Sequence, residues 1–491
     1  MHPALLVDEL LQEVFNLCRL DNEYRKTLVR LARCCQAWKE PALRNAWEDL
    51  PCLTPLLKLI VGLAVLLLLD ISLIRVQNTP YSTPPEELDG YQRMVRHVRL
   101  ETKVGNDVAL GPLFHDTTPL LPNLQSVAVL MDGCAAPAVH LLLSPMLSSI
   151  TIDIGVSTGR AVGVERSGNI SAYLSALVSS SIPIQKLCIR GFACEKLNQA
   201  VSNLSTLKSL SLKVGISLST ATVITIANFP LLEELFAHAD RVDVDSLRES
   251  LDASSLPAFP NLQTLDIRSS VGVAATILQH TQSTNFTRFS IEVTQDDNSG
   301  WMHLYPVIPT TIQEIRIDHH IYPVDLTSDA TDITNDHPFT IENLGALPNF
   351  TTLRAFTLET NLLVDFVDKD IEKLTKWWPA LRLFDLTVSS DGECKEGGGS
   401  EAQTARWTPK LAVGCLSVIA KGWPHLERLR LPIDLASESK KAQSLPIHSQ
   451  LREFKIIPPL AVEHRTPLID AHVAVIRNLF PLVSNDFAAF G

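Results

Sequence analysis

Three short segments hold the residues best suited to chemistry, and none has the spacing of a known catalytic or metal site. Asp318–His320 could offer metal ligands, but neither an HExxH motif nor further spaced His or Cys ligands accompany it. Gly397–Ser400 lacks the Val- or Ile-rich strand that leads into a phosphate-binding loop. Asp296–Asp297 adjoins Asn, Ser and Gly, which is loop composition. The nucleotide-binding patterns GxGxxG and GxxxxGK[ST] are absent, so we expect no enzyme activity, no metal and no cofactor.

The composition predicts a globular chain that does not bind polyanions. Of its 491 residues, 46% are hydrophobic, which excludes disorder as the main state. The length suits roughly two to four domains or one repeat array. The net charge of −12 argues against nucleic acid or an anionic membrane as the partner. The 9 cysteines form no CxxC pair and predict reduced, mostly buried thiols of a cytoplasmic or nuclear protein.

One apolar segment, Leu59–Leu69, resembles a membrane span in composition. Asp70 is the single charged residue between Lys58 and Arg75. The intervening stretch would form a helix of about 24 Å, shorter than a hydrocarbon core of about 30 Å. We therefore favour a buried helix over a membrane segment. A gene-model artefact is a third alternative, because the run differs so much from its surroundings.

Residues 3–50 have the apolar periodicity of a small helical module. One apolar face recurs at helical spacing from Leu6 to Cys18, and a second runs from Leu28 to Trp38. Pro41 is placed to begin a third helix. Three short helices bury little surface by themselves. We therefore favour a module that docks on a partner over one that only caps the next domain.

The stretches VDELLQEVF and LVRLARCCQAWKEPALRNAWEDL resemble an F-box. A helix is followed by a second helix that ends in Cys-x-x-Trp, and the motif ends with Trp-x-x-Leu. Where the family usually has Leu-Pro before the first helix, this chain has Pro3–Val7. Glu40–Leu57 is also similar to the fungal F-box proteins that continue into leucine-rich repeats.

The resemblance implies partners and contact residues for this module. F-box proteins bind the Skp-type adaptor of a cullin-based ubiquitin ligase. The positions that match the family, and that the resemblance assigns to adaptor binding, are Leu10, Leu11, Phe15, Leu31, Cys35, Trp38, Trp47 and Leu50.

The rest of the chain repeats a short pattern, apolar-x-x-apolar-x-apolar. It runs from Val95-Val98-Leu100 to Leu451-Phe454-Ile456. An apolar-Pro turn precedes several copies in register, as in Phe229-Pro230-x-Leu232 and Trp423-Pro424-x-Leu426. This is the leucine-rich-repeat pattern, although the usual Asn is missing from most units.

The predicted fold is an α/β solenoid, an irregular leucine-rich-repeat horseshoe, preceded by the small all-α F-box-like module. Each unit has one strand and a return segment, and stacking buries an apolar side that no unit can bury alone. The domains are residues 3–50, a helical or apolar linker over 51–90, and repeats over 91–491. A doubly wound α/β fold is the competing architecture, but it would carry a Gly-rich phosphate loop.

Residues that flank the central apolar position of each repeat strand should point to the concave sheet face. Their mixed charges and few aromatics suit a protein substrate better than a phosphate backbone. The candidate substrate-binding residues are Arg190, Phe236, His238, Asp266, Arg268, Arg288, Glu314, Arg316, Asp318, Arg428 and Arg430.

These observations predict a non-catalytic substrate-recognition subunit of an SCF-type ubiquitin ligase. The expected partners are a Skp-type adaptor, a cullin scaffold and an unidentified protein substrate, with no nucleic acid and no membrane. The alternative is a stand-alone leucine-rich-repeat scaffold whose N-terminal helices only cap the solenoid.

Overall fold

The computed structural model describes the chain in segments that fall into two compact units, Met1–Ile216 (unit 1) and Ser217–Gly491 (unit 2). The described residues are 7–57, 86–101, 119–130, 142–155, 160–191, 194–215, 218–293, 300–319, 339–348, 350–360, 364–388, 409–434, 450–457 and 476–483. The apolar run Leu59–Leu69 and most of the predicted linker 51–90 lie outside them. Among the described residues, no helix is long and apolar enough to cross a membrane.

Unit 1 contains the helical module and the first repeats. Its helices are α1 (Asp8–Cys18), α2 (Tyr24–Ala32), α3 (Gln36–Glu48), α4 (Thr54–Leu57), α6 (Glu86–Met94), α7 (Arg160–Ser179) and α8 (Glu195–Ser202). Its strands are β1 (Asp49–Leu50), β2 (His97–Glu101), β3 (Ser126–Leu130), β4 (Ser149–Asp153), β5 (Lys186–Gly191) and β6 (Ser209–Val214).

Unit 2 contains the later repeats. Its helices are α9 (Thr220–Ala227), α10 (Val244–Ala253), α11 (Val271–His280), α12 (Trp301–Leu304), η5 (Tyr305–Val307), η6 (Ile341–Leu344), α14 (Asp368–Trp377) and α15 (Cys415–Gly422). Its strands are β7 (Glu234–His238), β8 (Thr264–Arg268), β9 (Arg288–Val293), β10 (Glu314–His319), β11 (Ala355–Thr360), β12 (Leu383–Val388), β13 (Arg428–Pro432) and β14 (Glu453–Ile457).

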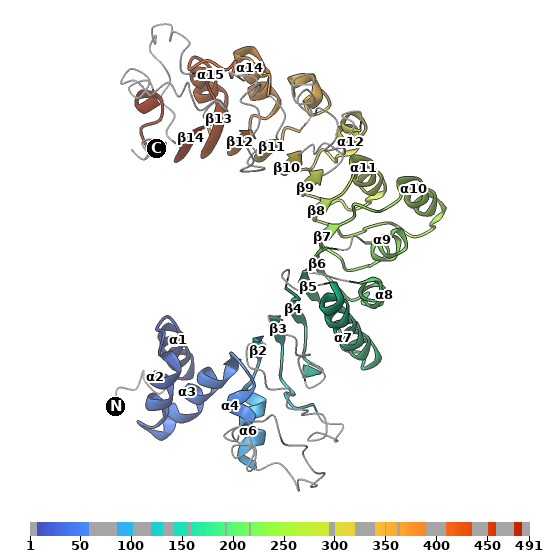
Figure 1. Ribbon diagram of the computed structural model, residues 1–491. Coiled ribbons are helices and arrows are strands. Elements are labelled where there is room, and N and C mark those ends of the chain that lie inside the picture. The colour runs from blue at the N-terminus through green and yellow to red at the C-terminus, as the bar shows by residue number, and fades with distance from the viewer. Residues whose placement is uncertain are drawn as a thin grey trace, which may run out of the picture. The chain divides into compact units, whose positions relative to one another are not determined.

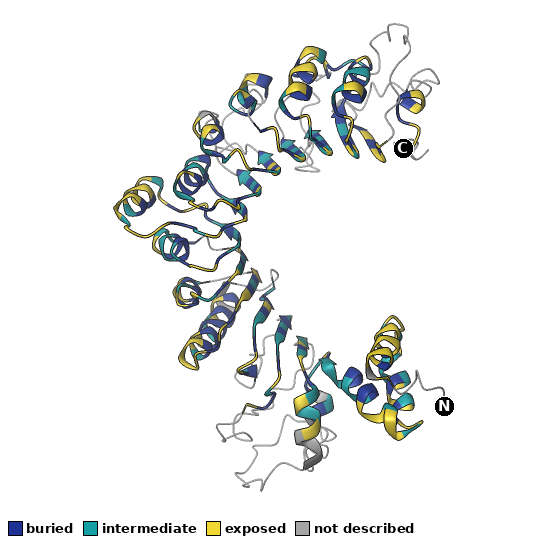
Figure 2. Ribbon diagram, turned by 180° about the vertical axis from the view of Figure 1, so that it is seen from behind, coloured by how far each residue is buried: buried dark blue, intermediate teal, exposed yellow. Residues whose placement is uncertain are grey.

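Within each unit the strands are parallel and follow one another in chain order. Each predicted apolar triplet lies at a strand. Its side chains are buried, as Leu262, Leu265 and Ile267 show at β8, except for Leu100 of β2, which is half-buried. The helices cover one side of the sheet, and the buried residues lie between the two layers (Figures 1 and 2). The fold is an α/β solenoid of the leucine-rich-repeat type, as the sequence predicted.

The turn before each strand explains the apolar-Pro frame. In the frame Trp378-Pro379-x-Leu381, the N–H of Leu381 donates to the carbonyl of Trp378 over 3.2 Å, which closes a turn with Pro at its second position. The Trp378 ring is buried, and its Nε1 donates to the carbonyl of Leu347 over 3.0 Å. The frame thus reverses the chain and adds a large side chain to the core.

A backbone contact repeats from one coil to the next. The carbonyl of Gln263, just before β8, accepts from the N–H groups of Thr287 and Arg288 at 3.0 and 3.1 Å. The carbonyl of Thr287 accepts in the same way from Gln313 and Glu314. Because this bond needs only main-chain atoms, the coils stack in register although most units lack the usual Asn.

The helical module forms, but the predicted helix boundaries are wrong. The second helix ends at Ala32 and does not reach Trp38, because Cys35 is extended (φ −158°, ψ 161°) and begins α3. Pro41 therefore lies inside α3 and does not start it. The Nδ2 of Asn45 donates to the carbonyl of Pro41 over 3.0 Å.

The thiols are less buried than the sequence predicted. Among the described cysteines only Cys415 is buried, while Cys34 is exposed and the others are intermediate. Burial raises the pKa of the Cys415 thiol, and the nearby carboxylate of Asp368 raises it further. The expectation of mostly buried thiols is therefore wrong, since repeat strands place residues such as Cys188 on the outer side of the sheet.

Truncation of a core ring should weaken unit 2 strongly. Phe384 is fully buried, and its ring centroid lies 4.9 Å from that of Trp423 and 5.9 Å from that of Phe356. We expect Phe384→Ala to lower the free energy of unfolding by about 3–5 kcal/mol through the lost contacts and the cavity. Urea unfolding followed by circular dichroism measures this.

The matched control is Thr357→Ala on the neighbouring strand, whose side chain lies on the outer side of the sheet. This change should shift the urea midpoint little. Similar midpoints for the two variants would contradict the assignment of Phe384 to a packed core.

Candidate protein-interaction surfaces

The helical module has a core of its own. Leu11, Phe15 and Leu28 are buried together with Ala32, Ala42 and Ala46. The ring of Trp38 packs edge-on against that of Phe15, with centroids 6.3 Å apart and an interplanar angle of 78°. Leu11, Phe15 and Trp38, which were predicted to contact the adaptor, thus contribute to the module's own core.

The first helix exposes a second set of apolar side chains, here called the α1 stripe. It consists of Val7, Leu10, Val14 and Leu17, whose exposed fractions are 42, 50, 45 and 59%. Their spacing of three and four residues places them along one side of the helix, next to the side that Leu11 and Phe15 bury. The apolar face of α1 is therefore wider than the module's own core can cover.

The structure separates the eight positions that match the F-box. Of these, only Leu10 belongs to the exposed stripe. Leu11, Phe15 and Leu50 are buried, whereas Leu31, Cys35 and Trp38 are half-buried. The centroid of the Trp47 ring lies 4.6 Å from that of Tyr91, so Trp47 packs against α6. Sequence analysis placed Val14 on the apolar face of this helix together with Leu11 and Phe15, and it did not select Val7 or Leu17, although the period of α1 already contained this signal.

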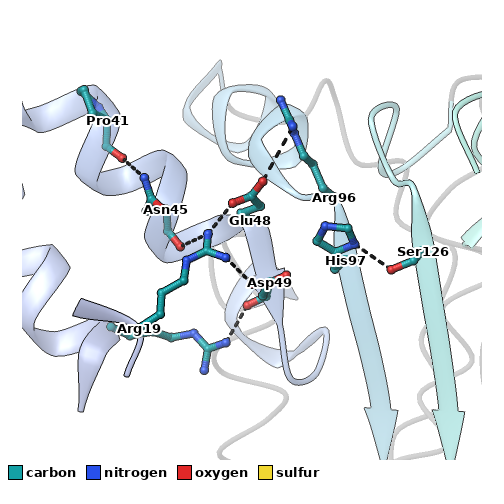
Figure 3. A network of polar contacts seen from close by, with 9 residues as sticks. Arg19, Pro41, Asn45, Glu48, Asp49, Arg96, His97 and Ser126 are labelled. Atoms are coloured by element: carbon teal, nitrogen blue, oxygen red, sulfur yellow. Dashed lines mark hydrogen bonds and ion pairs between the residues drawn. The ribbon is translucent and has the colours of Figure 1, made fainter. Parts of the chain in front are cut away.

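A polar network joins the module to the first strands (Figure 3). The Arg19 guanidinium donates to Glu48 and, over 2.8 Å, to Asp49. Glu48 also lies 3.7 Å from Arg96, just before β2. In addition, β1 is the register partner of β2, with Leu50 opposite Val98. Within unit 1 the module and the repeats are thus continuous.

The predicted substrate-binding residues all lie at outward positions of their strands. They alternate with buried residues and are exposed or half-exposed on the side of the sheet away from the helices, here called the open face. Strand register brings several together. Phe236 of β7 is opposite Asp266 of β8, and His238 is opposite Arg268. Arg288 of β9 is opposite Glu314 of β10.

On the open face of unit 2, arginines and carboxylates alternate between strands. The ion pairs are Arg268–Asp240 (3.4 Å), Arg268–Glu292 (3.4 Å), Arg288–Glu234 (3.9 Å), Arg316–Glu359 (3.9 Å), Arg428–Glu453 (3.5 Å), Arg430–Asp385 (3.2 Å) and Arg430–Glu453 (3.6 Å). Such exposed pairs contribute little stability, about 0–1 kcal/mol each. They leave a mixed-charge surface on which these five arginines already have intramolecular partners.

A shallow depression of about 360 Å³ lies at the N-terminal ends of the last strands of unit 2. Its lining residues are Arg382, His425, Glu427, Gln450, Arg452 and Leu482. Arg382 and Glu427 form an ion pair of 3.6 Å across it. Across the described part of the chain, no group of His, Cys, Asp and Glu side chains could hold a metal ion.

One motif in unit 1 could hold a nucleophile, and sequence reasoning missed it. Gly155–Gly159 reads Gly-Val-Ser-Thr-Gly and matches G-x-S-x-G between β4 and α7. Ser157 lies outside the described residues. The strands β3 and β5, which flank β4, contain no His that could act as its base. The absence of catalysis therefore stays a prediction. Ser157 is the residue whose substitution would test it.

Comparisons with known proteins give only distant structural likeness. No protein-family model matches the sequence, and no curated protein does. The leucine-rich repeat-containing protein LegL7 from Legionella pneumophila is 14% identical over 61% of this chain and 85% of its own, with a TM-score of 0.30. A chain of the yeast Rad7 and Elc1 complex is 13% identical over 58% of this chain and 75% of its own, with a TM-score of 0.31. The strand register and burial therefore carry the fold assignment.

Loss of Arg19 should weaken the connection between the module and β2. Its guanidinium contacts two carboxylates and is only 26% exposed. We expect Arg19→Ala to lower the free energy of unfolding of this region by about 1–3 kcal/mol, because Glu48 and Asp49 lose a hydrogen-bonded cation. Hydrogen exchange of the amides of β1 and β2 measures the effect.

The control for this change is Arg44→Ala, which removes an exposed ion pair with Glu40 on the same module. It should leave exchange in β1 and β2 unchanged. Equal exchange rates in the two variants would show that Arg19 does not join the module to the sheet.

Proposed function

We propose that this protein is a substrate-recognition subunit of an SCF-type ubiquitin ligase. In this proposal the helical module docks on a Skp-type adaptor, which links it to a cullin scaffold. The repeats hold a protein substrate, and other subunits carry out ubiquitin transfer. The α1 stripe is the observation that carries the proposal.

The stripe supports docking because it is not needed for folding of the module. A helix that covers one core has an apolar face on one side, and further exposed apolar residues mark an interaction surface. Leu10, Val14 and Leu17 are about half exposed, although Leu11 and Phe15 beside them are buried. A row spaced in this way fits the groove of a helical partner. It occurs in the stretch that resembles an F-box.

The open face of the repeats supports the substrate-binding role. Side chains of both charges and the ring of Phe236 lie at outward positions of parallel strands. Loops and helices do not supply these positions, so the sheet holds them in fixed rows about 4.8 Å apart. A protein surface with matching charges could bind across several strands at once.

A stand-alone repeat scaffold is the second candidate function. The network around Arg19 and the pairing of β1 with β2 favour it, because a terminal cap needs such contacts with the first coil. A cap, however, does not require the exposed apolar side chains of the α1 stripe. The two functions therefore differ in what they predict for that stripe.

Charged substitutions in the stripe should abolish adaptor capture. We would co-purify the full chain with a recombinant Skp-type adaptor and cullin, and compare it with Leu10→Asp/Leu17→Asp. The variant should lose binding by about thirtyfold or more, because central apolar anchors cost about 2 kcal/mol or more when lost. Both positions are exposed, so the module should stay folded.

The matched control is Gln12→Asp/Asn16→Asp, which adds the same charge on another side of α1 at exposed positions. It should bind the adaptor as the unmodified chain does. Trp38→Ala is a poorer test, since the Trp38 ring packs against Phe15 in the core. Failure of the unmodified chain to capture the adaptor would refute the ligase role and favour the scaffold.

A further inference from the structure

The depression at the N-terminal ends of β12, β13 and β14 receives one charged side chain from each of three coils. These strands are neighbours in the sheet (Figure 1). Arg382, Glu427 and Arg452 each come directly before a strand, and all three line the depression. The N–H of Glu427 donates to the carbonyl of Arg382 over 2.7 Å, and that of Arg452 donates to the carbonyl of Glu427 over 2.9 Å. Because neighbouring strands lie about 4.8 Å apart, these side chains form a row along one edge of the sheet, here called the edge row.

The charges of the edge row do not balance. Arg382 and Glu427 form an ion pair of 3.6 Å, with side chains that are 56 and 45% exposed. Arg452 is exposed, and no carboxylate of the described residues lies at ion-pair distance from it. The adjacent acid Glu453 does not neutralise Arg452, because its carboxylate pairs with arginines of β13. Among the described residues, the row therefore keeps one cation without an anion in a chain whose net charge is −12.

An exposed apolar side chain lies at the same depression. Leu482 is one of its lining residues and is 59% exposed. The N–H of Val483 donates to the carbonyl of Phe480 over 3.2 Å, which closes a turn with Pro481 at its second position. The Phe480 ring is buried, and its centroid lies 6.0 Å from that of Phe454 in β14. Leu482 is therefore held at the depression by a turn that is anchored in the core.

We propose that this depression binds a carboxylate of a protein partner together with an apolar residue next to it. Arg452 donates two parallel hydrogen bonds to the carboxylate, the arrangement of the strongest arginine ion pairs. Leu482 packs against the apolar residue and removes its surface from water. The carboxylate can belong to a Glu or Asp side chain or to the partner's C-terminus, because both present the same two acceptor oxygens.

The shape of the depression favours a protein segment over a small organic acid. Its volume of about 360 Å³ lies at the lower end of the range for ligand pockets, about 300–1,000 Å³. Because the depression is shallow, a free acid of a few atoms would stay largely in water and gain little affinity. A peptide can extend from the depression over the adjoining strands. The inference rests on the proposed role of the repeats in protein binding, and it does not depend on the adaptor.

Glu427 limits the kind of anion that can bind. Its carboxylate lies in the edge row between the two arginines and repels a ligand of high negative charge. A single carboxylate at Arg452 remains about one strand spacing away from it. The charge of −12 also repels nucleic acid at long range. The site therefore suits one carboxylate and not a polyanion.

Peptide binding to the full chain tests the proposal directly. The probes are three short fluorescein-labelled peptides that contain Leu. The first has Glu after Leu and an amidated end, the second ends in Leu with a free carboxylate, and the third has Gln after Leu and an amidated end. Fluorescence anisotropy at low ionic strength, where surface charges are least screened, measures their affinities. The first or the second should bind about tenfold or more tightly than the third, and the tighter one identifies the source of the carboxylate.

Two variants should change this affinity in opposite directions. Arg452→Ala should weaken binding of the preferred peptide about tenfold or more, because its carboxylate loses a charge-assisted hydrogen bond. Glu427→Gln should tighten binding about threefold, because it removes a repelling carboxylate and releases Arg382 from its ion pair. A purely structural role of these residues would not produce opposite effects.

The matched control is Arg354→Ala. Arg354 directly precedes β11 and is exposed without a described carboxylate at ion-pair distance, but it does not line the depression. This variant should keep the affinity within about twofold, because more distant surface charges are screened. Equal weakening by Arg354→Ala and Arg452→Ala, weaker binding by Glu427→Gln, or equal affinity for all three peptides would overturn the proposal. Adaptor capture by the Arg452→Ala variant separates this result from the ligase role.

Discussion

The stacking of one coil on the next is the constraint on which the rest of this structure depends. In the coils from β3 onwards, two side chains of the strand and one before it are buried, as Ile312, Ile315 and Ile317 are at β10. The carbonyl before each strand accepts two N–H groups from the next coil, as Gln313 does from Arg354 and Ala355. The apolar residues supply the driving force and the main-chain bonds fix the register. A coil without neighbours would lose both.

This constraint also determines where function can lie. Inward positions are committed to the core, so recognition falls to the outward residues of the strands and to the exposed side of α1. The strands present those outward residues in rows, and each row combines side chains far apart in the sequence. Charges of opposite sign can therefore meet across neighbouring strands, as Arg430 and Asp385 do.

Much of the fold could be predicted from the sequence, because the apolar residues that form the repeat pattern are the residues that form the core. Every apolar triplet that the pattern selects lies at a strand, including weak copies such as Leu232-Leu235-Ala237. The helix boundaries of the module could not be predicted, because the apolar period runs through Cys35, whose backbone is extended in the structure. Nor could the sequence divide the apolar residues of α1 between Phe15, which is buried, and Leu17, which is exposed. Likewise, the composition showed charges of both signs but could not show which arginines form ion pairs, because strand register determines which side chains are neighbours.

The central claim is that the exposed side of α1 is a docking surface for a Skp-type adaptor. Hydrogen exchange of the full chain, measured with and without the adaptor, tests it most directly. The account predicts slower exchange in Asp8–Cys18 when the adaptor is present, with the strands of the repeats unchanged. Unchanged exchange in α1 at saturating adaptor would contradict it and leave the helices as the cap of a repeat scaffold.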